Sequence, residues 1–201
     1  GRISVGTENS KGIELFLQKK YSNNWYTTLS YSNSVSIADD PRPGKEGEIY
    51  SKKMDYGQVM TFLGGYKLHF RQYDWYNAIR SDNFLKYLLY LPIMPSDILE
   101  VSFRYRYMGG RPYTPRTYLP QHREWFLSEN WNSERYNFYS RLDVMILRRF
   151  NFNKVNIITF LDLQNVFNRN NQWEYVHLPD GRKEMAFQYK QLPVAGVTIE
   201  F

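Results

Sequence analysis

The sequence contains no cysteine, so neither a disulfide framework nor a thiolate metal site can form. It also lacks any apolar run near the roughly 20 residues that a membrane-spanning helix requires. The three histidines, His69, His122 and His177, are far apart, and none has a second histidine four residues away, which argues against a zinc site. Nucleophile-elbow, phosphate-loop and paired-carboxylate motifs are missing too. We therefore expect no enzyme activity, no resident metal and no cofactor.

Charge of one sign is not concentrated anywhere in the chain. The 26 basic and 20 acidic residues give a net charge of +6 that is spread along the sequence. This spread argues against a nucleic-acid partner and is compatible with an anionic surface such as lipopolysaccharide. Asp39, Asp40, Glu46 and Glu48 share one polar stretch but lack the regular spacing of a calcium-binding loop, which favours a solvated loop.

Aromatic residues, in contrast, are abundant. They make up 18% of the chain, with 18 Tyr and 13 Phe, although the mean hydropathy is only −0.61. A transmembrane β-barrel reconciles these values, because its strands alternate lipid-facing apolar residues with lumen-facing polar ones and carry aromatic girdles at both membrane interfaces.

Seven segments show the alternation of a β-strand. They are residues 11–20, 25–36, 56–68, 97–108, 138–150, 155–167 and 192–201. In the last one, Ala195, Val197, Ile199 and Phe201 share one apolar face. Taken alone, this segment fits the last strand of a soluble sandwich and the closing strand of an outer-membrane barrel equally well.

The segment 97–108 has the clearest alternation. Apolar side chains at every second position from Leu99 to Tyr107 alternate with Glu100, Ser102 and two arginines. In a soluble sheet the polar set would face solvent, whereas in a barrel it would line a wet lumen, since an arginine on lipid costs roughly 2–4 kcal/mol near the midplane. The charged residues expected to face the lumen and a plug are Glu100, Arg104, Arg106, Arg141, Asp143 and Asp162.

The connections between the segments alternate in character. Residues 21–24, 69–96 and 151–154 are short or structured, and residues 37–52, 109–137 and 168–191 are long and polar. Transmembrane barrels have short periplasmic turns and long extracellular loops, and a sandwich has no reason to sort its loops in this way. The sorting therefore favours a barrel with its C-terminus in the periplasm.

The connection 69–96 changes to a helical period, with Trp75, Ile79, Leu85, Leu88 and Leu89 near helical spacing. We expect an interfacial helix within residues 73–90 that lies along the inner leaflet. The alternative is a helix that caps the periplasmic mouth of the barrel.

A series of short motifs carries a family resemblance. In chain order these are Gly12-Ile13-Glu14-Leu15, Lys19-Lys20, Asn24-Trp25, Tyr31-Ser32, Asp55, residues 64–68 (GGYKL), Pro95-Ser96-Asp97, Arg106-Tyr107, residues 109–115 (GGRPYTP), Arg141-Leu142-Asp143, residues 161–171 (LDLQNVFNRNN), Leu192-Pro193 and residues 196–201. By their order and spacing the chain resembles, over nearly its whole length, the C-terminal part of a TonB-dependent outer-membrane receptor.

This resemblance implies a 22-stranded antiparallel barrel occluded by a plug, to which residues 1–201 would supply about the last seven strands as the C-terminal portion of one barrel domain. The plug and the remaining strands, in the same polypeptide or a separate chain, are then partners, as is the TonB complex. Val197, Ile199 and Phe201 resemble the terminal signature that the outer-membrane assembly machinery reads. The closing sequence departs from that of the SusC-like branch, which weakens the case for a SusD-like lid and leaves a surface lipoprotein partner open.

The function that the resemblance implies is active uptake of a scarce nutrient (a siderophore, haem, a peptide or an oligosaccharide) across the outer membrane of a Gram-negative bacterium. The alternatives are a carbohydrate-binding β-module and a passive porin or adhesin-like barrel. Ligand-binding candidates are aromatic and basic residues of the long loops, which could equally form the outer girdle or pack the loops together. They are Tyr113, Tyr118, Arg123, Trp125, Phe126, Trp131, Trp173 and Tyr175.

Overall fold

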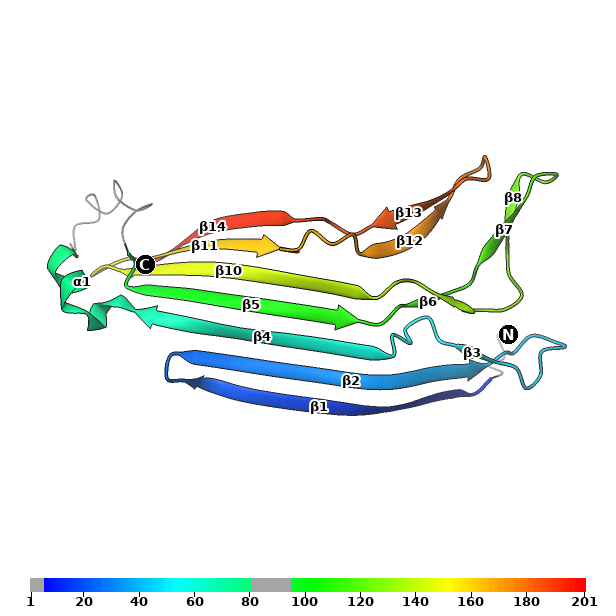
Figure 1. Ribbon diagram of the computed structural model, residues 1–201, viewed down its shortest axis with the longest axis horizontal. Helices are drawn as coiled ribbons and strands as arrows, with labels where there is room; N and C mark the ends of the chain where they lie inside the picture. The colour runs from blue at the N-terminus through cyan, green and yellow to red at the C-terminus, as the bar shows by residue number, and fades with distance from the viewer. Residues whose placement is uncertain (1–5, 81–94) are drawn as a thin grey trace.

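The computed structural model describes residues 6–80 and 95–201, and it is built almost entirely of β-strands (Figure 1). The long strands are β1 (Glu8–Ser22), β2 (Trp25–Asp39), β4 (Gln58–His69), β5 (Ile98–Met108), β10 (Tyr139–Asn151), β11 (Asn156–Gln164) and β14 (Leu192–Glu200). The short strands are β3 (Ile49–Ser51), β6 (Pro112–Tyr113), β7 (Arg116–Leu119), β8 (Glu124–Leu127), β9 (Glu134–Arg135), β12 (Gln172–His177) and β13 (Lys183–Phe187). The seven long strands coincide with the seven segments expected from the sequence.

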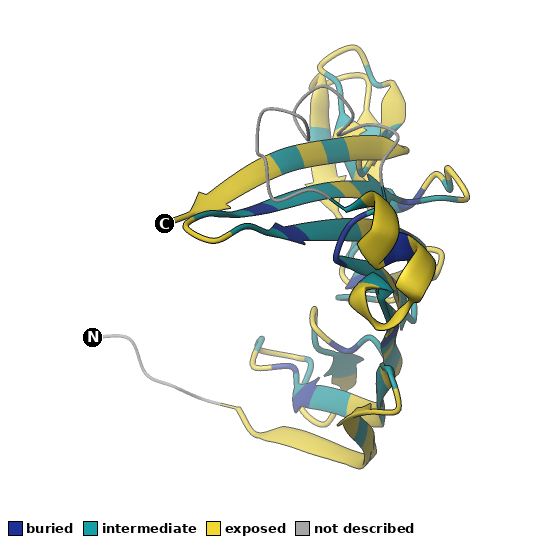
Figure 2. Cartoon of the chain, turned by 90° about the vertical axis from the view of Figure 1, so that its left-hand side faces the viewer, coloured by how far each residue is buried: buried dark blue, intermediate teal, exposed yellow. Residues whose placement is uncertain are grey.

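The long strands form one antiparallel sheet in the order β1-β2-β4-β5-β10-β11-β14, so each pairs with the next long strand along the chain. Seen along the strands, the sheet bends into an open arc (Figure 2). Within residues 6–80 and 95–201 the outer edges of β1 and β14 pair with no other strand. The expected all-β antiparallel architecture is therefore confirmed, whereas a closed barrel is not observed.

The strand register separates the sheet into an apolar face and a polar face. Cross-strand partners in an antiparallel sheet point to the same side, and Phe62, Tyr105 and Leu142 are successive partners across β4, β5 and β10. Further along the sheet, Ile146 pairs with Leu161, which in turn pairs with Ala195. The apolar side chains of all seven strands thus form one continuous face, as the alternation predicted.

The connections are sorted between the two ends of the sheet (Figure 1). The β1–β2 and β10–β11 turns, the helical segment and the C-terminus lie at one end, which we call the short-turn end. The short strands β3, β6–β9 and β12–β13 lie at the other, the long-loop end. The β1–β2 turn contains Asn23 at φ +51° and Asn24 at φ +66°. Two consecutive residues with positive φ are typical of the tight hairpin turns that match strand twist, which confirms the turn expected there.

The helical insert is shorter in the described residues than expected. The 3₁₀ turn η1 (Phe70–Gln72) leads into α1 (Asp74–Ile79), which carries Trp75 and Ile79 and is followed by Arg80 in extended conformation. The rest of the expected helix, with Leu85, Leu88 and Leu89, lies outside the described residues. None of the described helices is long and apolar enough to cross a membrane.

Several expected boundaries were wrong. β1 begins at Glu8, three residues before the expected segment 11–20, and β2 extends to Asp39, where β3 pairs with it and takes up part of the expected 37–52 loop. The long connections 109–137 and 168–191 hold strands instead of irregular loops, because their backbone groups pair in the local hairpins β7–β8 and β12–β13. β14 ends at Glu200, so the fully exposed Phe201 lies beyond the strand rather than inside it.

A buried carboxylate fixes the helical segment to the sheet. Asp97 is 2% exposed and accepts hydrogen bonds from Arg71 Nε (2.8 Å), Arg80 Nε (2.7 Å) and Tyr76 Oη (3.0 Å) at its Oδ1 atom. Its Oδ2 atom accepts the Asn151 backbone N–H at 2.6 Å. Asp97 therefore joins η1 and α1 to the end of β10, which explains why the sequence places a carboxylate directly before β5.

Candidate functional site

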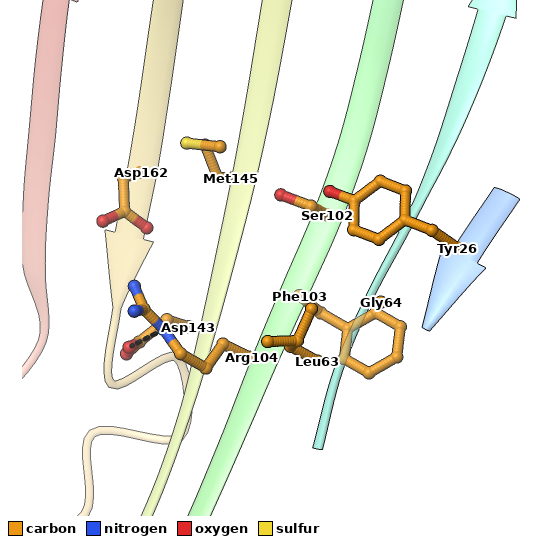
Figure 3. Close-up of a pocket in the computed structure, with 9 residues that line it drawn as sticks. All are labelled: Tyr26, Leu63, Gly64, Ser102, Phe103, Arg104, Asp143, Met145 and Asp162. Carbon is orange, nitrogen blue, oxygen red and sulfur yellow. Dashed lines mark ion pairs between the residues drawn. The ribbon is translucent and has the colours of Figure 1, made fainter. Parts of the chain in front are cut away.

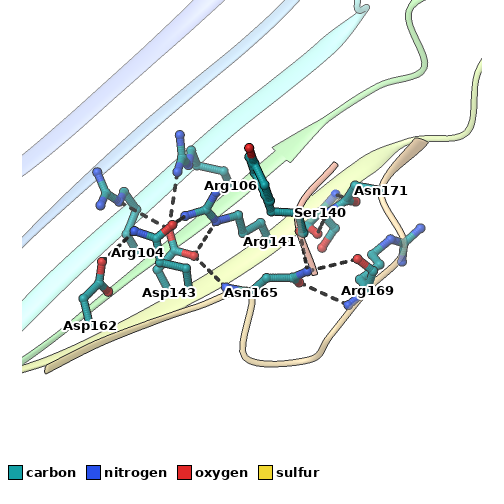
Figure 4. Close-up of polar contacts among 11 residues, drawn as sticks. Arg104, Arg106, Ser140, Arg141, Asp143, Asp162, Asn165, Arg169 and Asn171 are labelled. Carbon is teal, nitrogen blue, oxygen red and sulfur yellow. Dashed lines mark hydrogen bonds and ion pairs between the residues drawn. The ribbon is translucent and has the colours of Figure 1, made fainter. Parts of the chain in front are cut away.

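The charged residues of the polar face gather around Asp143. Asp143 lies opposite Arg104 in the register of β10 and β5, and Arg141 lies opposite Arg106, so all four side chains are on one face. Asp143 is 2% exposed. Its Oδ1 atom accepts Arg141 Nε at 2.5 Å, and its Oδ2 atom lies 3.3 Å from Arg106 Nη2 and 3.8 Å from Arg104 Nε (Figure 4). The structure therefore brings four of the six expected lumen residues into one ionic cluster.

The other two expected lumen residues belong to the same face. Asp162 lies opposite Met145 and accepts Gln164 Nε2 at 3.0 Å. Glu100 accepts the Tyr26 hydroxyl at 2.6 Å and pairs with Lys67 Nζ at 3.1 Å.

A hollow of about 200 Å³ lies on the polar face beside the Asp143 cluster. It is lined by Tyr26, Leu63, Ser102, Arg104, Asp143 and Asp162, among others. Figure 3 shows Arg104, Asp143 and Asp162 directed toward the same space.

A turn rich in asparagine supports the cluster from the long-loop end. Asn165 has a φ of +52° and is 1% exposed, and its backbone N–H donates to Asp143 Oδ1 at 3.0 Å. Its side-chain amide donates to the Arg169 carbonyl and accepts from the Arg169 N–H. The side-chain amide of Asn171 does the same with the carbonyl and N–H of Ser140 (Figure 4). Asparagine tolerates positive φ and bonds nearby backbone groups. The motif at residues 161–171 therefore fixes the Asp143 carboxylate through the Asn165 backbone N–H.

At the long-loop end, three tyrosines from separate elements meet. The rings of Tyr113 and Tyr136 stack with centroids 4.4 Å apart, and Tyr175 lies 5.4 Å from the first and 5.6 Å from the second. Lys183 Nζ lies 3.6 Å from the centre of the Tyr175 ring. Arg111 lies against Tyr136 at 5.3 Å.

This tyrosine cluster borders a hollow of about 440 Å³ with a basic lining. Lys53, Arg111, Arg116 and His177 contribute to its wall, with Glu174 as the acidic member. Burial, followed by the nearby charges of Arg116 and Lys183, lowers the pKa of His177, so this imidazole is neutral at pH 7. The hollow can therefore offer guanidinium and ammonium donors beside aromatic faces, a combination suited to binding rather than to acid–base catalysis.

A second aromatic group joins two loop hairpins. Trp125 of β8 lies 4.5 Å from the His177 ring and 5.3 Å from Tyr118 of β7. Trp125 Nε1 donates to Leu178 O at 2.8 Å, and the Tyr118 hydroxyl donates to Pro179 O at 3.0 Å. These contacts hold the β7–β8 hairpin against β12–β13, so both aromatic residues pack the loops on one another.

The remaining loop candidates lie elsewhere. Trp131 stacks edge-on with Tyr50 (5.3 Å) under the guanidinium of Arg42. Trp173 lies beside Arg111 at 5.4 Å, and Phe126 lies 6.3 Å from His122. Arg123 occupies the β7–β8 turn at φ +55°. The sequence reasoning missed Tyr136, Arg111 and Lys183, although the GGRPYTP motif itself contains Arg111.

Three of the four acidic residues of the first polar stretch are satisfied within it, while Asp39 ends β2 and accepts a hydrogen bond from Thr7 Oγ1. Asp40 pairs with Arg42, Glu48 pairs with Lys45 Nζ at 3.1 Å, and Glu46 accepts the Gly44 N–H. Across the described part of the chain, no three His, Cys, Asp or Glu side chains are grouped so as to hold a metal ion.

No known protein family matches this chain. Neither a curated protein nor a solved structure matches it. Its function therefore has to be inferred from the two faces of the sheet and from the loops at its ends.

Proposed function

We propose that this chain is part of an outer-membrane β-barrel that actively imports a scarce nutrient with energy from a TonB complex. The observation that carries the proposal is the apolar face that crosses all seven long strands while the opposite face carries ion pairs. The motif resemblance to TonB-dependent receptors supports the same assignment. The plug, the remaining strands, the TonB complex and the outer-membrane assembly machinery are the partners that the proposal requires.

The size of the apolar face favours contact with lipid. Seven strands leave six spacings of about 4.8 Å, so the face is about 29 Å wide. Along β5 it runs from Leu99 to Tyr107, about 27 Å at roughly 3.4 Å per residue. Soluble monomers rarely expose a contiguous apolar patch beyond a few hundred Å², and this face reaches about 780 Å² by those two lengths. Leu161 and Val197, which lie on it, are 50% and 66% exposed.

Aromatic residues are placed toward both ends of this face. Trp25 pairs with Tyr66 near the short-turn end, and Tyr31 and Tyr107 lie toward the long-loop end. Lys19 Nζ lies 3.8 Å from the centre of the Trp25 ring and bonds the Ser22 and Trp25 carbonyls. Aromatic girdles at two interfaces, with a lysine directed out of the apolar layer, are typical of transmembrane barrels.

The tyrosine cluster at the long-loop end is the proposed nutrient-contact site. With the long loops outside the cell, the basic hollow beside Tyr113, Tyr136 and Tyr175 opens on the extracellular side. The C-terminal residues Val197, Ile199 and Phe201 then lie toward the periplasm, where they serve barrel assembly. A carbohydrate-binding β-module would use the same aromatic residues but would gain nothing from an apolar sheet face.

Growth experiments test this proposal. A Gram-negative strain that depends on the full-length protein for one of the four nutrient classes should stop growing on that nutrient when its TonB complex is deleted. Tyr175→Ala removes a ring contact worth about 0.5–1.5 kcal/mol, so uptake affinity should fall up to about tenfold at an unchanged amount of assembled protein. Tyr189→Ala, at an 86% exposed tyrosine of the same connection, is the matched control and should have no effect.

Two outcomes would contradict the proposal. Growth that does not depend on TonB would indicate a passive porin. A protein that stays in solution after washing without detergent would indicate a soluble module.

A further inference from the structure

The ionic cluster around Asp143 carries more positive than negative charge. Three guanidiniums, from Arg104, Arg106 and Arg141, lie within 4 Å of a single carboxylate. Arg141 bonds Asp143 Oδ1 through Nε and donates to Gln164 Oε1 through Nη2 at 2.6 Å. The Asn165 N–H also donates to Asp143 Oδ1. Arg104 and Arg106 therefore share the one remaining oxygen, Oδ2, and their two positive charges are under-compensated.

Arg104 and Arg106 have unused donors. Arg106 reaches Asp143 only through Nη2 at 3.3 Å, and its Nε atom is buried with no hydrogen-bond partner among the described residues. The Arg104 side chain is 51% exposed, and its nearest acidic atom is Asp143 Oδ2 at 3.8 Å, beyond hydrogen-bond distance. An unsatisfied buried donor destabilises the folded state, so an acceptor bound to this pair of arginines would offset a penalty that the cluster otherwise carries.

We propose that Arg104 and Arg106 form a carboxylate-binding site on the polar face of the sheet. Both side chains are partly exposed, 51% for Arg104 and 37% for Arg106, so a small acidic group can approach them from the polar face beside the hollow that Arg104 borders. A guanidinium presents a fork of N–H donors that matches a carboxylate. The charge of the whole cluster favours a monoanion, because Arg104, Arg106 and Arg141 against Asp143 and the neighbouring Asp162 leave an excess of one positive charge. This site does not depend on transport or on TonB.

The carboxylate has two sources, which an experiment can separate. It is either a free small acid or an acidic side chain of a polypeptide segment that lies on the polar face. The full-length protein, labelled with ¹⁵N in its arginine side chains and purified in a mild detergent, is titrated with sodium acetate against sodium chloride at constant ionic strength. Arg104→Lys and Arg106→Lys assign the two Nε–H resonances. Arg182, which pairs with Asp180 on an exposed hairpin, serves as the internal reference.

For a free acid, acetate should shift the Arg104 and Arg106 resonances to saturation and leave Arg182 unchanged. Arg104→Lys keeps the positive charge but loses the planar pair of N–H donors that bonds both carboxylate oxygens, so it should weaken acetate binding about fivefold or more. For a docked segment, the Nε–H of Arg104, whose side chain is 51% exposed in this chain, should already be protected from exchange with water before acetate is added, and acetate should have no effect.

The proposal is overturned if the Arg104 Nε–H exchanges freely and acetate shifts neither resonance. It is also overturned if acetate shifts Arg182 as much as Arg104, because that result indicates only unspecific screening.

Discussion

We expect Leu161→Arg to lower the free energy of unfolding of the lipid-embedded protein by about 2–4 kcal/mol, the cost of an arginine near the bilayer midplane. Leu161 lies on β11 between Ile146 and Ala195, in the apolar face, and is 50% exposed. If this face met water, a substitution at so exposed a side chain would change stability by no more than about 0.5 kcal/mol. Equilibrium unfolding in liposomes by guanidinium measures the difference.

The matched control is Ser30→Arg, which places the same side chain on the other face of a central strand. Ser30 is exposed and lies between Phe16 and Thr61 in the register. The proposed lumen is wet, so this variant should unfold like the parent protein. Equal losses in both variants would mean that the two faces do not differ in environment, and no loss in either would place the apolar face in water.

The second large effect should come from Asp97→Asn. The substitution removes the carboxylate that accepts hydrogen bonds from Arg80, whose side chain is 11% exposed. Removing one partner of a buried pair costs about 3–5 kcal/mol, and we expect about 3 kcal/mol because Arg71, the second guanidinium, is half exposed. The free energy of unfolding measures this loss. Asp180→Asn, at an exposed pair with Arg182, should leave the free energy of unfolding nearly unchanged.

The pH dependence of unfolding distinguishes this ionic role from simple packing. Burial acts to raise the pKa of Asp97, but hydrogen bonds from Arg80, Arg71, Asn151 and Tyr76 outweigh it and hold the pKa below its usual value. A carboxyl whose pKa is lower in the folded state contributes stability above its unfolded pKa, near 3.9, and loses that contribution as the pH falls through the folded pKa. Stability should therefore fall below about pH 4, and less steeply in Asp97→Asn. This role would be contradicted if the free energy of unfolding fell below about pH 4 as steeply in Asp97→Asn as in the parent protein.

The architecture could be predicted from the sequence because alternation is a local signal that the register preserves. The alternation in 97–108 was sufficient to separate Glu100, Arg104 and Arg106 from their apolar neighbours, and the pairing with β10 then placed Asp143 and Arg141 on the same side. The end of the sheet at which each connection lies could also be predicted, because successive antiparallel strands place their connections alternately at the two ends.

The details of the sites were not predictable in the same way. The tyrosine cluster depends on Tyr113, Tyr136 and Tyr175 arriving from three elements far apart in the sequence, and no periodicity links them. The hairpins β7–β8 and β12–β13 were missed because their strands are only four to six residues long, and short strands give a weak alternation signal. The role of Asn165 depends on its positive φ, for which the only sequence signal was the abundance of asparagine in residues 165–171.

Because these 201 residues contain no cysteine, single probes can be attached at chosen positions. Leu161→Cys and Ser30→Cys are labelled with an environment-sensitive fluorophore in the full-length protein, with any other cysteine replaced, and reconstituted into vesicles. The proposed membrane barrel predicts that brominated lipid quenches the probe at position 161 and leaves the probe at 30 bright, while aqueous iodide does the reverse. Quenching of the probe at 161 by iodide and not by brominated lipid would contradict the assignment of the apolar face to lipid.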